Sequence, residues 1–424
     1  MSNKQAVWHD KKLWALALAE TLAWAGLFYV FPASLLRWSD HFGWSIADLS
    51  LGFTFALLAS ALSSIAAGRL IDRGWSRLLM TGSVVTGALL ILLLPSVNLI
   101  WQFYVVWIFI GITLSGCLYE PCFSYLTKTY KENAKSPIIM VTLFAGFAST
   151  ISYPVTNLLS NAFSWEIGIY VFSAALCIVT APLFWFGVSG RDFSEEPKVR
   201  KEKVEPLKIG CNERLPLLGT IVPVLRNPIF WGLFVTFAAF GSNHGMVVSQ
   251  IFPLFESREV SPSLALLLAS CIGPMQVAAR LILFAAESLT GRSIPMVRVA
   301  FFSLICLSLS SLTLSFGSTS TALIVGFVIL QGGPYGLVSI IKPVVTAEAL
   351  GTTNFGIVSS MAGMGSVWSF AIAPGIAGFI AESWSYDVVL GTTFSIAIIG
   401  IIGLLATLHL RQKTVQSSGI MNSA

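Results

Sequence analysis

The sequence has few charged residues for its length. Only 11% of its 424 residues are charged, whereas 55% are hydrophobic, and a soluble domain carries roughly 25% charged residues. This composition excludes an ordinary soluble protein. The net charge of +5 comes with no basic stripe interleaved with aromatic residues, so we expect no nucleic-acid partner.

Residues that could support catalysis or hold a metal are also scarce. The chain has six cysteines and four histidines, and five of the cysteines lie in apolar runs, where Cys acts as a small hydrophobic residue. No phosphate-binding glycine loop and no Ser-His-Asp or Cys-His set can be assembled. We therefore expect no enzyme activity, no metal site and no cofactor, and an energy source in an ion or solute gradient.

Long apolar runs fill the rest of the chain, and each can cross a bilayer as a helix. They predict an all-α membrane protein with twelve transmembrane helices. The runs fall at 13–36, 47–68, 78–95, 99–126, 138–160, 166–188, 229–255, 262–286, 297–316, 320–345, 355–381 and 386–409.

Lys and Arg are distributed unevenly over the connections between these runs. If both termini are cytoplasmic, Arg37 and Arg258 are the only Lys or Arg residues in the outer loops. Because cytoplasmic loops retain positive residues, both termini are expected to be cytoplasmic. The expected location is the inner membrane of a bacterium.

The chain also shows signs of an internal repeat. Four short matches occur in the same order in the first and second parts of the sequence, as in transporters built from two related halves. We expect an N-terminal half at 1–188, a cytoplasmic central loop at 189–228 and a C-terminal half at 229–424. The matches pair Gly68-Arg69-Leu70 with Ala279-Arg280-Leu281, Gly116 and Tyr119 with Gly332 and Tyr335, Ala145-Gly146 with Ala362-Gly363, and Trp165 with Trp384.

The loop after the second run reads Gly68-Arg-Leu-Ile-Asp72-Arg73-Gly-Trp75-Ser76-Arg77. It resembles the loop signature of the major facilitator superfamily, although Trp75 and Ser76 replace the later Gly-Arg pair. The resemblance implies the major facilitator fold, with two six-helix halves. It also implies a conformational gate at Gly68, Asp72, Arg73 and Arg77, which latches the cytoplasmic helix ends. A plain positive loop is the alternative.

Three ionisable residues lie inside the runs at a similar depth, namely Glu20, Glu120 and Arg280. Such groups are costly in a membrane and mark functional sites by default. We expect them to converge on a cavity, where Glu120 or Glu20 exchanges a coupled proton and His244 is the next candidate. The alternative for each is an interhelical tether.

Gln276 and Arg280 are four residues apart, so they share one face of the eighth expected span. This span resembles that of the monocarboxylate transporters, in which an Asp precedes the carboxylate-binding Arg by four residues. The resemblance implies that Arg280 binds a carboxylate, and Gln276 stands where the Asp would be. Alternatively, Arg280 only repeats Arg69.

Further polar residues near the middle of their spans complete the expected substrate site. They are Asn243, Tyr119 and Tyr335. Gly332-Gly333-Pro334 is expected to loosen the tenth span. Lys342 is expected to extend toward the cytoplasmic surface.

Together these features predict a secondary active transporter that moves a small organic solute, favoured as an anion or carboxylate, by proton-coupled alternating access. The expected partners are this solute, H+ and the lipid bilayer, and the expected state is a monomer. The alternatives are a transporter of siderophores or drug-like compounds, for import or efflux, and a transporter-like receptor that does not transport.

Overall fold

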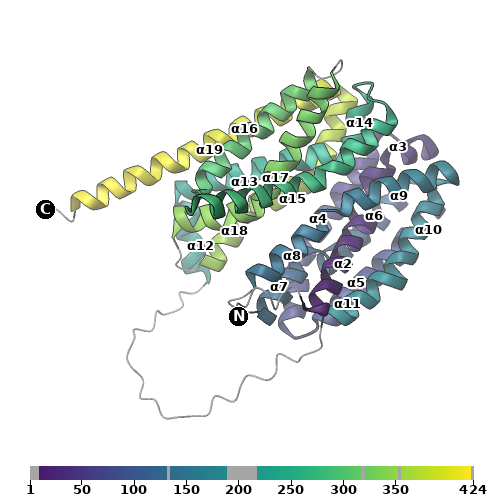
Figure 1. Ribbon diagram of the computed structural model, residues 1–424, viewed down its shortest axis with the longest axis horizontal. Helices are drawn as coiled ribbons and strands as arrows, with labels where there is room; N and C mark the ends of the chain where they lie inside the picture. Colours follow the sequence, from purple (N-terminus) through teal and green to yellow (C-terminus); the bar gives the residue numbers. More distant parts are fainter. Residues whose placement is uncertain (1–8, 131–133, 189–216, 317–319, 352–354, 422–424) are drawn as a thin grey trace, which may run out of the picture.

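The computed structural model describes residues 9–130, 134–188, 217–316, 320–351 and 355–421, which form helices and no strand. The helices make two bundles that lie side by side (Figure 1), the N-terminal one in purple to teal and the C-terminal one in green to yellow. The expected division at 1–188 and 229–424 stays a prediction. The expected central loop lies largely outside the described residues.

The N-terminal half consists of helices that are often interrupted. They are α2 (Lys11–Ala23), η1 (Trp24–Phe28), α3 (Val30–Phe42), α4 (Ile46–Asp72), α5 (Ser76–Ile91), η2 (Leu94–Ser96), α6 (Ile100–Cys117), α7 (Tyr119–Tyr130), α8 (Lys135–Ala145), α9 (Ala148–Ala162), α10 (Trp165–Ala175), η4 (Leu176–Thr180) and α11 (Ala181–Gly187).

The C-terminal half is built mainly from longer helices. They are α12 (Leu217–Arg226), α13 (Pro228–Ser249), α14 (Ile251–Glu256), α15 (Pro262–Thr290), α16 (Met296–Ser315), α17 (Thr321–Leu350), α18 (Phe355–Ser383) and α19 (Tyr386–Met421).

Eleven helical segments in the described part of the chain are long and apolar enough to cross a membrane. The expected span at 229–255 corresponds to α13 and α14, which are not among the eleven. The polar residues Asn243 and His244 lower the mean hydropathy of α13, yet both are buried inside the C-terminal half.

Prolines account for most of the interruptions in the N-terminal half. Leu118, which separates α6 from α7, is extended, and Pro121 lacks the N–H that would bond the carbonyl of Cys117. The two π-helical turns, η1 and η4, end four and two residues before Pro32 and Pro182. A π turn shifts the hydrogen-bonding pattern and so accommodates such a defect.

The expectation that Gly332-Gly333-Pro334 loosens the tenth span is wrong, because α17 is continuous from Thr321 to Leu350. The glycines instead let α15 pack closely against α17. A Cβ atom on Gly332 would lie 2.8 Å from the carbonyl oxygen of Ile272. Interior packing leaves no room for such a group.

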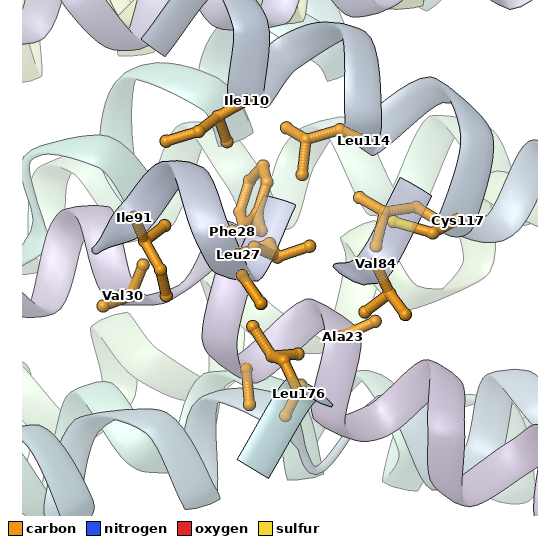
Figure 2. Close-up of a cluster of buried hydrophobic side chains, with 14 of the residues drawn as sticks. Ala23, Leu27, Phe28, Val30, Val84, Ile91, Ile110, Leu114, Cys117 and Leu176 are labelled. Carbon is orange, nitrogen blue, oxygen red and sulfur yellow. The ribbon is translucent and has the colours of Figure 1, made fainter. Parts of the chain in front are cut away.

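The π-helical turn η1 is fixed in the core of the N-terminal half. Figure 2 shows Leu27 and Phe28 of η1 among side chains that include Ile91, Ile110 and Leu176. Leu27 is completely buried and Phe28 is 3% exposed. Leu27 therefore holds the irregular turn inside the N-terminal half, whereas Phe28 also faces Phe370 of the C-terminal half.

The halves are joined mainly where α4 packs against α18 and α9 packs against α15, with smaller contacts from α3 to α13 and α14. In the first pair the amide of Gly375 donates to Thr54 Oγ1 at 2.8 Å. Nearby, Gln250, between α13 and α14, donates from Nε2 to Ser50 Oγ on α4 at 2.7 Å. Tyr386 donates its hydroxyl to Gln250 Oε1 at 3.2 Å. The first two bonds close one end of the interface, opposite the end where α7 and α12 lie in Figure 1, and the third fixes Gln250 within the C-terminal half.

Candidate functional site

A cavity of about 420 Å³ lies between the two halves. Its walls come from both halves, and three charged side chains reach it, namely those of Glu120, Arg280 and Lys342. A concave, mainly apolar site with a few convergent polar groups is the usual form of a small-molecule site.

Arg280 on α15 is held by two backbone carbonyl groups. Its Nε donates to the oxygen of Gly336 on α17 at 2.7 Å, and its Nη1 donates to the oxygen of Thr142 on α8 at 3.1 Å. In the described part of the chain no carboxylate lies within 4.0 Å of the guanidinium. The two carbonyls orient the group without neutralising its charge.

Three tyrosines interact electrostatically with Arg280. Tyr119 and Tyr335, expected from the sequence, come from α7 and α17, and Tyr29 comes from the junction of η1 and α3. Tyr29 is a site residue that the sequence analysis missed. Its position depends on the π turn before it, which shifts the face of the helix on which it falls.

Aromatic rings form a row across the boundary between the halves. The imidazole of His244 stacks on Tyr335 with ring centroids 3.5 Å apart, and Phe370 lies 6.4 Å from His244 and 6.1 Å from Phe28. The planes of successive rings differ by 13° to 24°. All four residues line the cavity, so the row gives it an apolar surface.

His244 has one ring nitrogen in an unusual environment. Nδ1 is buried and has no hydrogen-bond partner among the described residues. A buried nitrogen without a partner costs free energy. The imidazole is thus a candidate for contact with a solute or a proton.

Glu120 and Lys342 line the cavity from opposite halves, Glu120 from the first turn of α7 and Lys342 from α17. The two groups interact electrostatically but do not form an ion pair within 4.0 Å. Glu120 is exposed. Lys342, expected to extend toward the surface, is a cavity residue.

Glu20 lies behind the wall of the cavity. It is completely buried and adjoins Cys122 and Trp24. Neither carboxylate oxygen forms a hydrogen bond of good geometry with a described residue. A buried carboxyl group in such a place is costly, which keeps Glu20 a candidate functional residue.

The two remaining expected substrate residues, Gln276 and Asn243, lie in different places. Gln276 lines the cavity. Asn243 does not, because its Nδ2 donates to the carbonyl of Thr393 at 3.0 Å and its Oδ1 accepts from Gln331 Nε2 at 2.9 Å. Gln331 in turn accepts from the hydroxyl of Ser310. Asn243 therefore belongs to a buried network that connects α13, α16, α17 and α19.

The expected gate residues form contacts within the N-terminal half. Asp72 makes an ion pair with Lys128 on α7. Arg77 Nε donates to the carbonyl of Val188 at 2.7 Å, and its guanidinium lies over the ring of Trp185. Arg73 is exposed, and a Cβ atom at Gly68 would meet nothing within 4 Å.

Three successive contacts join α8 and α9 to α15. Toward the closed end, Thr150 Oγ1 donates to the carbonyl of Ser270 at 2.8 Å. Next, a Cβ atom on Gly273 would lie 1.9 Å from the Gly146 carbonyl oxygen, so the two backbones touch. The third contact is the bond from Arg280 to Thr142.

Comparison with known proteins agrees with this architecture. A family model described as Major Facilitator Superfamily matches residues 13–330. No curated protein matches the chain.

Two solved structures have the same fold. A bacterial homologue of the human lysosomal transporter Spinster, in an inward-facing and unoccupied conformation, aligns with a TM-score of 0.66 at 14% identity over 98% of this chain and 99% of that chain. The nucleoside transporter NupG aligns with a TM-score of 0.67 at 13% identity, over 95% and 99%. At these identities the likeness establishes the fold alone.

Proposed function

Because the chain belongs to the major facilitator superfamily, we propose that it is a secondary active transporter that moves a small organic anion by alternating access. The observation that carries this proposal is Arg280, which lies in the cavity between the halves and has no carboxylate within 4.0 Å among the described residues. A desolvated guanidinium needs an anion. Its planar fork suits a carboxylate, in keeping with the resemblance to monocarboxylate transporters.

The balance of charge in the cavity supports an anionic solute. Arg280 and Lys342 provide two cations against the single carboxylate of Glu120. The three tyrosines provide neutral hydroxyl donors that can bond a carboxylate. Cavity volumes of roughly 300 to 1,000 Å³ are typical for small molecules. A volume of about 420 Å³ lies near the lower limit and favours a small acid over a bulky siderophore or drug-like compound.

We further propose twelve spans, with α13 as the seventh, and cytoplasmic termini in the inner membrane of a bacterium. Asn243 and His244 on α13 are buried within the half, so their polarity does not meet lipid. The positive loops support the orientation. The cavity then opens toward the cytoplasm, as in the inward-facing Spinster homologue, and the monomer is the transporting unit.

Coupling to protons would use Glu120 or Glu20. Glu120 lines the cavity, and Glu20 is a buried acid whose oxygens make no hydrogen bond of good geometry with a described residue. Glu→Gln at the coupling position should abolish uptake against a gradient while solute exchange continues. If both single variants still concentrate the solute, the proton passes elsewhere, with His244 next.

The main test is counterflow in proteoliposomes with a labelled carboxylate. Arg280→Lys keeps the charge but loses the fork, and should weaken binding by about 1–3 kcal/mol. Arg298→Lys, at an exposed site on α16, is the matched control and should behave as the unchanged protein. A receptor that does not transport would bind the label without counterflow.

A double variant separates substrate binding from tethering. If Arg280 only balances Glu120, replacing both by Gln should restore affinity and transport. If Arg280 holds the solute, the double variant should fold and remain inactive. Recovery of affinity in the double variant would refute the anion site.

A further inference from the structure

Lys342 is the second cation of the cavity, and no carboxylate of the described residues lies within 4.0 Å of its ammonium group. Glu120, from the other half, is its electrostatic counterpart but does not pair with it. Withdrawing an ammonium from water without a partner is unfavourable. Both cations of the cavity therefore have room for an added anion.

The two cations meet α17 at different points, because Arg280 on α15 binds a carbonyl of α17 and Lys342 is a residue of α17. The carbonyl of Gly336 binds Arg280, and Lys342 lies six residues further along the same continuous helix. Six residues advance a helix by roughly 9 Å. Both side chains line the same cavity, so one short solute can reach the two of them.

The wall between the cations is suited to a carbon chain. Ser339 lies one turn before Lys342, and Val338 and Phe123 line the cavity together with it. A solute with a carboxylate at each end and a short apolar segment between them would match these surroundings. A single carboxylate would leave one cation without an anion.

We infer that Lys342 forms a second anion subsite next to Arg280, so that the preferred solutes are short dicarboxylates. This inference rests on the proposed function and narrows its substrate class. Glu120 is the internal competitor for Lys342, so a dicarboxylate binds at the expense of the attraction between Glu120 and Lys342. Glu120 is thereby a specificity-determining residue as well as a candidate proton site.

The test is calorimetric titration of the purified full chain with straight-chain dicarboxylates of four to eight carbons and with the corresponding monocarboxylates. The unchanged protein should bind one dicarboxylate length at least tenfold more tightly than any monocarboxylate. Lys342→Gln should weaken dicarboxylate binding by about ten- to hundredfold and change monocarboxylate binding less than twofold. Lys12→Gln, at an exposed position on α2, is the control and should change neither.

Glu120→Gln should act in the opposite direction. Removing the competitor should tighten dicarboxylate binding severalfold, and the gain should vanish when Lys342→Gln is also present. Lys342→Arg should retain the preference for dicarboxylates. This result would show that the weakened binding of Lys342→Gln comes from the lost charge and not from misfolding. Equal weakening of both acid classes by Lys342→Gln, or no weakening, would overturn the inference.

The failures of the two proposals are distinguishable. Monocarboxylate binding that depends on Arg280 but not on Lys342, without a preference for dicarboxylates, would refute the second subsite and leave the anion transporter intact. Absence of binding by both acid classes at every length would refute both.

Discussion

The two halves of the molecule differ in the continuity of their membrane helices. In the N-terminal half, four membrane segments contain a π turn or a break, at Trp24–Phe28, Leu118, Gly146 and Leu176–Thr180. In the C-terminal half, α15, α17 and α18 continue through their internal prolines. The sequence repeat therefore does not extend to the continuity of the helices.

This difference coincides with a division of chemical roles. The interrupted half supplies the acids Glu20 and Glu120, next to η1 and to the break before α7. The C-terminal half supplies the cations Arg280 and Lys342 from α15 and α17, which are long and continuous, although α13 and α14 are divided at Gln250. Irregular backbone at membrane depth is tolerated where it lies against protein or a cavity. We interpret the C-terminal half as the rigid frame of the anion site and the N-terminal half as the part whose backbone adapts around it.

The largest expected effect comes from disturbing the frame. A Cβ atom on Gly336 would lie 2.4 Å from the carbonyl oxygen of Gln276. Gly336→Ala should therefore separate α15 from α17 and displace the carbonyl that holds Arg280. We expect transport to be lost and the free energy of unfolding to fall by about 1–3 kcal/mol.

Gly326 on the same helix is the matched control, because a Cβ atom there would meet nothing within 4 Å. Gly326→Ala should leave transport unchanged in the same liposome assay. Normal transport by Gly336→Ala would show that the frame is less rigid than the packing indicates.

The next effect concerns the polar network that stabilises the frame. Asn243→Ala would leave Gln331 Nε2 and the carbonyl of Thr393 without their partner, which should cost about 1–3 kcal/mol of stability. Thermal unfolding followed by circular dichroism measures this loss, with Asn98→Ala in an exposed loop as the control. The solute affinity of the surviving folded protein should be unchanged. A large loss of affinity would instead restore Asn243 as a substrate contact.

The smallest expected effect lies in the N-terminal half. Asp72 pairs with Lys128 at an exposed position, and exposed pairs contribute about 0–1 kcal/mol. Asp72→Asn should slow transport severalfold without changing the order in which competing solutes inhibit it. Exchanging the two charges in Asp72→Lys with Lys128→Asp should recover part of the rate. An altered order of competitors at a normal rate would assign Asp72 to selectivity.

The sequence alone predicts the helical fold well, because the runs of apolar residues and the loop after Gly68 carry strong signals. It also predicts that Glu120 and Arg280 belong to one region, since charged groups at similar depth seldom face lipid. It fails for Asn243, whose partner Gln331 is 88 residues away. Tertiary pairing of this kind has no local pattern.

The sequence also does not predict which membrane helices are continuous and which are broken. Gly332-Gly333-Pro334 has the composition of a break, yet close packing against α15 keeps α17 regular. Conversely, the break at Leu118 arises from Pro121, and Tyr29 enters the cavity after the π turn η1. The effect of a proline in a membrane helix depends on what its neighbours contribute to the freed carbonyl, which the sequence does not reveal.

The backbone contact between Gly146 and Gly273 has a mechanical consequence. Gly146 and Gly273 touch through backbone atoms, with the side chains of Val277 and Ser149 packed beside them. In the proposed alternating-access cycle, this contact is the fulcrum about which one half turns against the other. Along α15 the fulcrum is roughly 17 Å from Pro262 and roughly 26 Å from Thr290. The lever arms are unequal, so one rotation moves the Thr290 end about one and a half times as far as the Pro262 end.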